Sequence, residues 1–154
     1  MAIKSFESQK ISAKDLIKKE SILVSDYMKR NVVYFHPEDN LRNVINVLLE
    51  KKISGGPVID HNKNLLGIIS EGDCLKQISE TRYYNSPETE KKVKDYMTKN
   101  VFTINENTSV YEAINLFLER KKRKFPIVKN GKLVGLITQK EILKAFLKMQ
   151  QQYF

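Results

Sequence analysis

An internal repeat constrains the fold of this chain more than any other feature of its sequence. Residues 24–32 recur as residues 93–101, with Asp-Tyr-Met and Asn-Val at matching positions. The offset is 69 residues up to Pro57 and 68 residues from Leu65 onward, because the second copy lacks one residue in between. Each copy spans about 55 residues, which is too few to bury an adequate core alone. The two copies are therefore expected to pack face to face as one body.

Within each copy, the sequence predicts the element order β-α-β-β-α. Short β-prone runs at 32–35 and 101–104 are each followed by a polar turn. Two further strands flank a second turn, which in the second copy is Asn130-Gly131, a strong hairpin signal. Ser109 begins a capping-box pattern. The apolar residues at helical spacing are Leu41, Val44, Ile45, Leu48 and Leu49 in the first copy and Val110, Ala113, Ile114, Phe117 and Leu118 in the second.

These elements divide the chain into five parts and predict an α+β fold class. The expected parts are an N-terminal helical extension (1–22), a first repeat (23–78), a polar linker (79–92), a second repeat (93–147) and a tail (148–154). The extension is weakly amphipathic from Ile11 to Ile22, which predicts a short helix lying against the repeats.

Composition and hydropathy predict a soluble intracellular protein. The apolar fraction of 41% suffices for a packed interior. No stretch approaches the length of a membrane-spanning helix, and the first ten residues lack the apolar core of a secretory signal. The single cysteine, Cys74, cannot form an internal disulfide. We therefore expect a cytoplasmic location and no membrane partner.

The charge of the chain is concentrated in its second half. The net formal charge is +9. Residues 24–76 carry seven basic and seven acidic side chains, whereas residues 93–144 carry eleven basic and five acidic ones, a net charge of +6. This asymmetry predicts a local anion site more than a generally adhesive basic surface.

Enzymatic chemistry finds little support in the sequence. His36 and His61 lie in expected turns and have no partner at metal-ligand spacing. The sequence contains no nucleophile elbow, P-loop or glycine-rich dinucleotide fingerprint. We expect no catalytic residue, no metal site and no catalytic cofactor.

Two hydroxyl–acid pairs, each at the end of a strand, are the informative motifs. Ser70 and Asp73 in the first copy correspond to Thr138 and Glu141 in the second. One interpretation is a capping box, in which hydroxyl and acid satisfy free backbone N–H groups at a helix start. The other is a nucleotide site, because a helix N-terminus attracts anions and a short Asp accepts hydrogen bonds from two ribose hydroxyls.

At these motifs the chain resembles tandem cystathionine-β-synthase (CBS) domains, a paired regulatory module. The resemblance covers about residues 21–147 and rests on several features together. They are the Asp-Tyr-Met segments at 26–28 and 95–97, the helix stripe, the strand proline and the Gly-x-x-Ser/Thr-x-x-acid end. The resemblance implies that the repeats pair about a pseudo-twofold axis, that adenine nucleotides such as AMP, ADP or ATP bind in the cleft, and that two pairs associate into a homodimer.

The resemblance also implies two unequal ligand pockets. In the family, ribose binds the motif acid and phosphate binds basic residues just before the strand proline. Combining one copy's acid with the other copy's first strand and basic pair gives a stronger pocket of Ser70, Asp73, Val101, Phe102, Arg123, Lys124 and Lys140. The weaker pocket combines Val32, Val33, Ser54, Gly55, Thr138 and Glu141, and it lacks a basic pair.

The basic run 120–124 leaves alternatives open. It is typical of a solvated helix end, of phosphate binding in the cleft, or of a nucleic-acid patch. The alternative function is therefore a basic interaction module that binds RNA or an acidic partner protein through 120–124. A structural dimer without a ligand is a third possibility. For the regulatory module, the sequence leaves the regulated partner protein unidentified.

Overall fold

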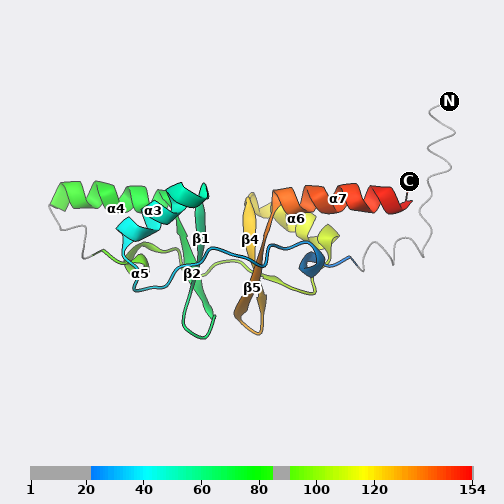
Figure 1. Cartoon of the computed structure of the whole chain (residues 1–154), viewed down its shortest axis with the longest axis horizontal. Coiled ribbons are helices and arrows are strands. Elements are labelled where there is room, and N and C mark those ends of the chain that lie inside the picture. Colours follow the sequence, from blue (N-terminus) through cyan, green and yellow to red (C-terminus); the bar gives the residue numbers. More distant parts are fainter. Residues whose placement is uncertain (1–21, 85–90, 154) are drawn as a thin grey trace, which may run out of the picture.

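The computed structural model describes residues 22–84 and 91–153, and it places one repeat in each half of an elongated molecule (Figure 1). In chain order, residues 22–84 contain the 3₁₀ helix η1 (Val24–Asp26), α3 (Leu41–Lys51), β1 (Gly55–Ile59), β2 (Leu65–Ser70) and α4 (Glu71–Tyr84). Residues 91–153 contain α5 (Val93–Tyr96), β3 (Ile104–Asn105), α6 (Val110–Arg120), β4 (Lys124–Lys129), β5 (Lys132–Thr138) and α7 (Gln139–Tyr153). The helix expected at 11–22 lies outside the described residues, apart from its last position.

The strands confirm a mixed α+β fold but differ between the repeats. β1 and β2 form an antiparallel hairpin, whereas the second sheet has the order β3-β4-β5 with β3 parallel to β4. The strand expected at 32–35 is reduced to one parallel bridge between Phe35 and Val58. The preceding residues leave this sheet because the chain there crosses from one repeat to the other, as described below.

The first long helix of each repeat, α3 or α6, forms where the sequence predicts it from a capping residue or from apolar residues at helical spacing. The Ser109 hydroxyl accepts a hydrogen bond from the Glu112 amide and so caps α6. The buried stripe comprises Leu41, Val44 and Leu48 in α3 and Val110, Ala113 and Phe117 in α6. The stripe is narrower than expected, because Leu49 and Leu118 are 74% and 73% exposed.

The second-repeat hairpin and the last helices extend these expectations. Asn130 and Gly131 both have positive φ angles and join β4 to β5 in a two-residue turn, as the Asn-Gly signal predicts. α4 continues to Tyr84, well into the segment expected to be a linker. No helix in the described ranges is both long and apolar enough to cross a membrane.

The leading segments of the repeats, residues 24–31 and 93–100, are exchanged between the two cores. Val24 and Met28 are buried in the core of the second repeat, together with Phe125. Conversely, Val93 is buried in the core of the first repeat, together with Leu41. Each core is therefore completed by side chains from the other copy.

Backbone pairing and a close approach at Gly67 fix this exchange. Lys29 and Leu136 form reciprocal N–H···O bonds of 2.8 and 2.9 Å, and Thr98 and Ile68 form an equivalent pair of 2.8 and 3.0 Å. A Cβ atom on Gly67 would lie 2.6 Å from the Thr98 carbonyl oxygen. The absence of a side chain is what lets the crossing segment approach this closely.

We expect Gly67→Ala to destabilise the fold by about 1–3 kcal/mol, because the added methyl meets backbone that cannot move aside easily. Urea unfolding of the full chain measures this loss. Gly72→Ala is the matched control, since a Cβ on Gly72 would meet only the Ser70 hydroxyl oxygen, at an ordinary contact distance of 3.7 Å, and Gly72 lies in α4. There the same substitution is expected to stabilise by about 0.5–1 kcal/mol. Equal stability of the two variants would contradict the exchanged packing.

Candidate functional site

A cavity of about 330 Å³ lies between the two repeats where β1 and β4 begin. The first repeat supplies one wall and the second repeat the other. The polar and charged side chains that line it are Lys29, Asn31, Lys52, Ser54, Arg123, Lys124 and Thr138. Its remaining lining is largely apolar and includes Val32, Val33, Ile53 and Leu136. An apolar cavity with several convergent cations is suited to a ligand with a flat apolar part and an anionic part.

The residues that end α3 and α6 have a left-handed backbone conformation and direct the segments that follow toward this cavity. Lys52 and Lys121 end α3 and α6 with φ angles of 55° and 51°. This conformation turns the chain sharply out of the helix and into the next strand. The residues that follow, Ser54 and Gly55 in one repeat and Arg123 and Lys124 in the other, therefore face the cavity from opposite repeats.

Lys124 joins the two walls directly. Its ammonium donates to the Gly55 carbonyl oxygen at 2.8 Å and to the Ser54 hydroxyl at 3.4 Å. Burial lowers the pKa of Lys124, and the charge of nearby Glu71 opposes this shift. A partly buried cation with neutral partners gains from an anionic one, since charge-assisted hydrogen bonds are the stronger kind.

Thr138 and Glu141 form the second-repeat pair at the edge of the cavity. The Glu141 carboxylate accepts from the Thr138 amide at 2.9 Å and from the Thr138 hydroxyl. Its other oxygen is buried, accepts no hydrogen bond within the described part of the chain, and lies 3.7 Å from the Lys29 ammonium. Glu141 thus contacts two residues that line the cavity, Thr138 and Lys29, without lining it itself.

The Ser70–Asp73 pair has the same geometry but does not line this cavity. The Asp73 carboxylate accepts from the Ser70 amide at 2.9 Å and from its hydroxyl at 3.0 Å. Both hydroxyl–acid pairs therefore make capping contacts in this structure. These contacts do not use the whole acceptor capacity of either carboxylate. Ribose binding by Asp73 or Glu141 therefore stays a prediction.

The structure groups the expected site residues differently from the sequence. Arg123 and Lys124 share their cavity with Val32, Val33, Ser54, Gly55 and Thr138 of the pocket expected to be weaker. Phe102 instead packs on Phe125, with ring centroids 5.6 Å apart, and lies under the Arg120 guanidinium at 3.5 Å. Lys140 is exposed and does not line this cavity. Arg123 and Lys124 thus share a cavity with Thr138, the motif hydroxyl of their own copy. They do not share it with Ser70, the motif hydroxyl of the first copy.

Val101 lines a second cavity of about 350 Å³ near the start of β2 and the end of β4. Its lining includes Leu65, Gly67 and Asn100, and it contains no charged side chain. An unpaired phosphate there would lose its hydration without gaining a cation.

The sequence analysis missed Lys29 and Lys52 as site residues. Lys52 lies two residues before Ser54, the first residue of the expected pocket segment Ser54-Gly55, so its proximity in the sequence is a usable signal. Lys29 was not accessible to sequence reasoning, because it reaches the second repeat only through the exchange of leading segments.

The expected absence of a metal site concerns the histidines and the acidic side chains. Residues 22–84 and 91–153 contain no group of three or more side chains that could hold a metal ion. His36 and His61 stack with ring centroids 5.1 Å apart, and the His36 Nδ1 atom lies 2.9 Å from the Ile59 carbonyl oxygen.

We expect Glu141→Gln to lower stability at neutral pH by about 1–3 kcal/mol, because it removes a buried charged acceptor. Burial alone would raise the pKa of Glu141, but the Thr138 hydrogen bonds and the Lys29 charge outweigh it and lower the pKa below its ordinary value. The stabilisation is therefore full above the unfolded-state pKa and is lost as pH falls through the folded-state value. Urea unfolding from pH 7 to pH 3 measures it; a gap between wild type and variant that does not narrow on acidification would contradict this assignment.

Comparison with known proteins identifies the family. The CBS domain family matches residues 24–80 and 93–148. The chain is 28% identical to the CBS domain-containing protein CBSX2 of Arabidopsis thaliana over 155 residues, covering 84% of this chain and 65% of that protein. It is 33% identical to inosine-5′-monophosphate dehydrogenase of Methanocaldococcus jannaschii, covering 91% of this chain and 26% of that enzyme. The chain thus spans less than two thirds of these relatives.

Solved structures agree with the fold. The crystal structure of CBSX2 in complex with AMP superposes with a TM-score of 0.74 at 32% identity, covering 84% of this chain and 98% of that one. The CBS domain pair of protein MJ0100, in complex with 5′-methylthioadenosine and S-adenosyl-L-methionine, superposes with a TM-score of 0.67 at 23% identity, covering 82% and 96%. Together with the two matched repeats and the paired architecture, these findings show that the chain belongs to the CBS-domain family.

Proposed function

We propose that this chain is a regulatory module, not an enzyme, that senses an adenosine-containing nucleotide in the cavity between its two repeats. The observation that carries the proposal is the cavity itself, in which Arg123 and Lys124 from one repeat face an apolar wall from the other. The AMP complex of a similar CBS pair supports it. A cytoplasmic location and the identity of the regulated protein stay predictions.

In this proposal, each part of the nucleotide has a matching part of the cavity. Arg123 and Lys124 bind phosphate oxygens, and Val32 and Val33 contact the base. The Thr138 hydroxyl, which donates to Glu141, is the group offered to the ribose.

The stronger pocket expected from the sequence combined Arg123 and Lys124 with Ser70, Asp73, Val101, Phe102 and Lys140. Of these last five residues, the uncharged cavity contains Val101. Ligand binding by the five stays a prediction.

The RNA-binding alternative is supported by one observation, the exposure of most of the basic run. Residues 120–123 are exposed, whereas Lys124 is partly buried and donates to the opposite repeat. The run is therefore divided between a solvated part and a part in the cleft. The two parts are separable by substitution.

We expect the double variant Arg123→Met/Lys124→Met to bind AMP at least tenfold more weakly while its affinity for adenosine changes about twofold at most, because charge-assisted contacts to phosphate are lost. Isothermal titration calorimetry measures both affinities. Lys121→Met/Lys122→Met is the matched control, since both lysines belong to the same run but do not line the cavity. Equal weakening of AMP and adenosine would contradict the proposal. Loss of RNA binding in the control, with no nucleotide binding in the wild type, would favour the alternative.

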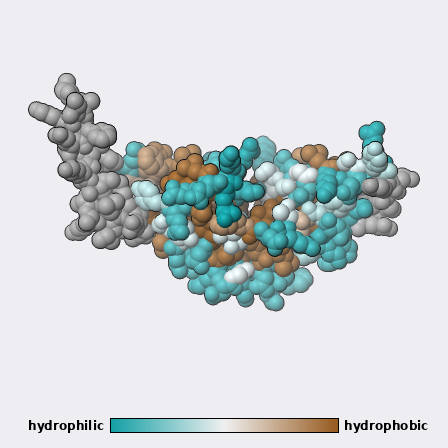
Figure 2. Space-filling view, turned by 180° about the vertical axis from the view of Figure 1, so that it is seen from behind, coloured by the Kyte–Doolittle hydropathy of each residue, from teal (hydrophilic) through white to brown (hydrophobic). Residues whose placement is uncertain are grey.

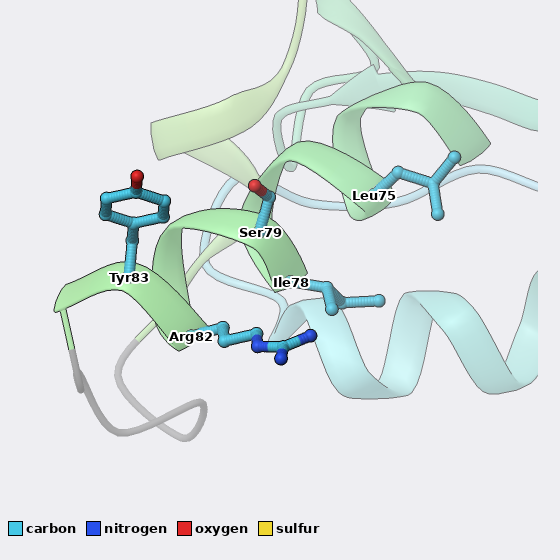
Figure 3. Close-up of a pocket in the computed structure, with 5 residues that line it drawn as sticks. All are labelled: Leu75, Ile78, Ser79, Arg82 and Tyr83. Carbon is cyan, nitrogen blue, oxygen red and sulfur yellow. The ribbon is translucent and has the colours of Figure 1, made fainter.

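We also propose that the chain forms a homodimer through α4 and α7. These helices lie along one edge of the molecule and run outward from its centre (Figure 1). At equivalent positions they expose apolar side chains: Leu75 and Leu143 are 67% and 64% exposed, and Ile78 and Phe146 are 45% and 47% exposed. The side chains in Figure 3 form a shallow pocket on α4 alone.

A twofold-repeated apolar edge fits a second copy of the same chain, because an isologous interface needs the same patch on both partners. On the face seen in Figure 2, hydrophobic patches interrupt the hydrophilic surface toward the upper left and upper right. The two helices contribute equivalent residues, so the edge is close to self-complementary about the pseudo-twofold axis.

Leu75→Glu/Leu143→Glu is expected to convert the dimer into a monomer, because four carboxylates would enter one apolar interface. Sedimentation equilibrium gives the mass, and circular dichroism confirms folding. Leu66→Glu is the control, since Leu66 is 37% exposed on β2, away from the helical edge. A dimer that persists in the double variant, or a wild-type monomer, would overturn this interface.

A further inference from the structure

The cavity between the repeats carries more positive charge than one phosphate requires. Four cations line it: Lys29 and Lys52 from the first part of the chain and Arg123 and Lys124 from the second. Among the described residues that line it, none carries a carboxylate. These cations therefore approach a bound ligand from both repeats.

Acidic side chains partly balance the charges of Lys29 and Lys124 but not those of Lys52 and Arg123. Glu141 lies 3.7 Å from Lys29, and Glu71 acts on Lys124 through its charge. Within residues 22–84 and 91–153, no ion pair involves Lys52 or Arg123. A surplus of positive charge thus remains at the cavity after its acidic neighbours are counted.

This surplus arises from differences between the repeats at equivalent positions. Lys29 corresponds to Thr98, Arg123 to Ser54 and Lys124 to Gly55. Only Lys52 has a basic equivalent, Lys121, and Lys121 does not line the cavity. The cavity of similar volume at Val101 has no charged lining at all. One of the two cavities therefore holds the cations.

We infer that this cavity is a polyphosphate site, which prefers an adenosine ligand with a di- or triphosphate chain to AMP and to S-adenosylmethionine. Arg123 and Lys124 hold the first phosphate, and Lys52 and Lys29 hold the phosphates beyond it. Each added phosphate brings negative charge toward cations that otherwise face only solvent or a distant acid. A sulfonium ligand brings positive charge instead. The adenosine part of this inference rests on the proposed function; the polyphosphate part rests on the cations alone.

The ligand in this arrangement binds both repeats at once. Arg123, Lys124 and Lys29, which is paired with Leu136, hold phosphates on the side of the second repeat, and Lys52 holds a terminal phosphate on the side of the first. Because Lys124 already donates to the Gly55 carbonyl oxygen of the opposite wall, a polyphosphate would replace one contact between the repeats by several. The number of phosphates would then set how firmly the repeats are held together.

Calorimetry of the full chain without divalent cations tests the inference with ATP, ADP, AMP, S-adenosylmethionine and inorganic tripolyphosphate. ATP is expected to bind about tenfold more tightly than AMP. Lys52→Met is expected to weaken ATP and tripolyphosphate about fivefold and AMP less than twofold. Lys121→Met is the matched control, because Lys121 has the same left-handed backbone conformation at the end of α6. It is expected to change neither affinity.

The possible results separate this inference from the proposed function. Equal affinities for AMP and ATP, or a Lys52→Met variant that weakens neither polyphosphate ligand, overturn the polyphosphate site and leave the adenosine module standing. Binding of tripolyphosphate that depends on Lys52, with adenosine adding nothing to it, supports the polyphosphate site and overturns the proposed function. Tightest binding of S-adenosylmethionine overturns the inference outright.

Discussion

The exchange of leading segments between the repeats is the interaction on which the rest of this structure depends. Val24 and Met28 complete one core, and Val93 completes the other. Since each repeat buries side chains supplied by its partner, neither copy has a complete core by itself. Unfolding of one repeat would therefore expose apolar side chains in the core of the other, so the two repeats are expected to unfold cooperatively.

The same exchange builds the cavity. The chain leaves the core of the second repeat after Met28 and reaches the sheet of the first repeat at Phe35. On the way, Lys29, Val32 and Val33 line the cavity at which β1 and β4 begin. The backbone pair of Lys29 with Leu136 fixes where this crossing begins. A ligand there contacts the segment that holds the repeats together, which gives a small molecule a direct means of changing how they pack.

The electrostatic asymmetry is superimposed on a nearly symmetric backbone. The left-handed turns, the hairpins and the capping acids occur in both copies, whereas the residues before the two strand prolines do not share their charge. Lys124 donates to the carbonyl oxygen of Gly55, which is its equivalent in the first repeat and offers no charge of its own. Gene duplication would supply the scaffold in such a protein, and a few substitutions at its centre are enough to favour one cavity over the other.

Much of the fold could be predicted from the sequence, because its signals are local. Apolar spacing located α3 and α6, Ser109 marked a helix start, and Asn130-Gly131 marked the hairpin. Contacts that depend on the exchange could not be found in this way. For this reason the basic pair was assigned to Asp73, whereas the structure places it beside Thr138. The exposure of Leu49 and Leu118 was also not predictable, since helical spacing gives a stripe but not its width.

Hydrogen–deuterium exchange of the full chain with and without saturating ATP tests the central claim most directly. A ligand in the cavity between the repeats is expected to slow exchange in residues 29–33, 52–55 and 123–124 together, because these segments form its opposite walls. Slower exchange confined to residues 70–73 and 101–103, or to residues 120–122 alone, would contradict the account.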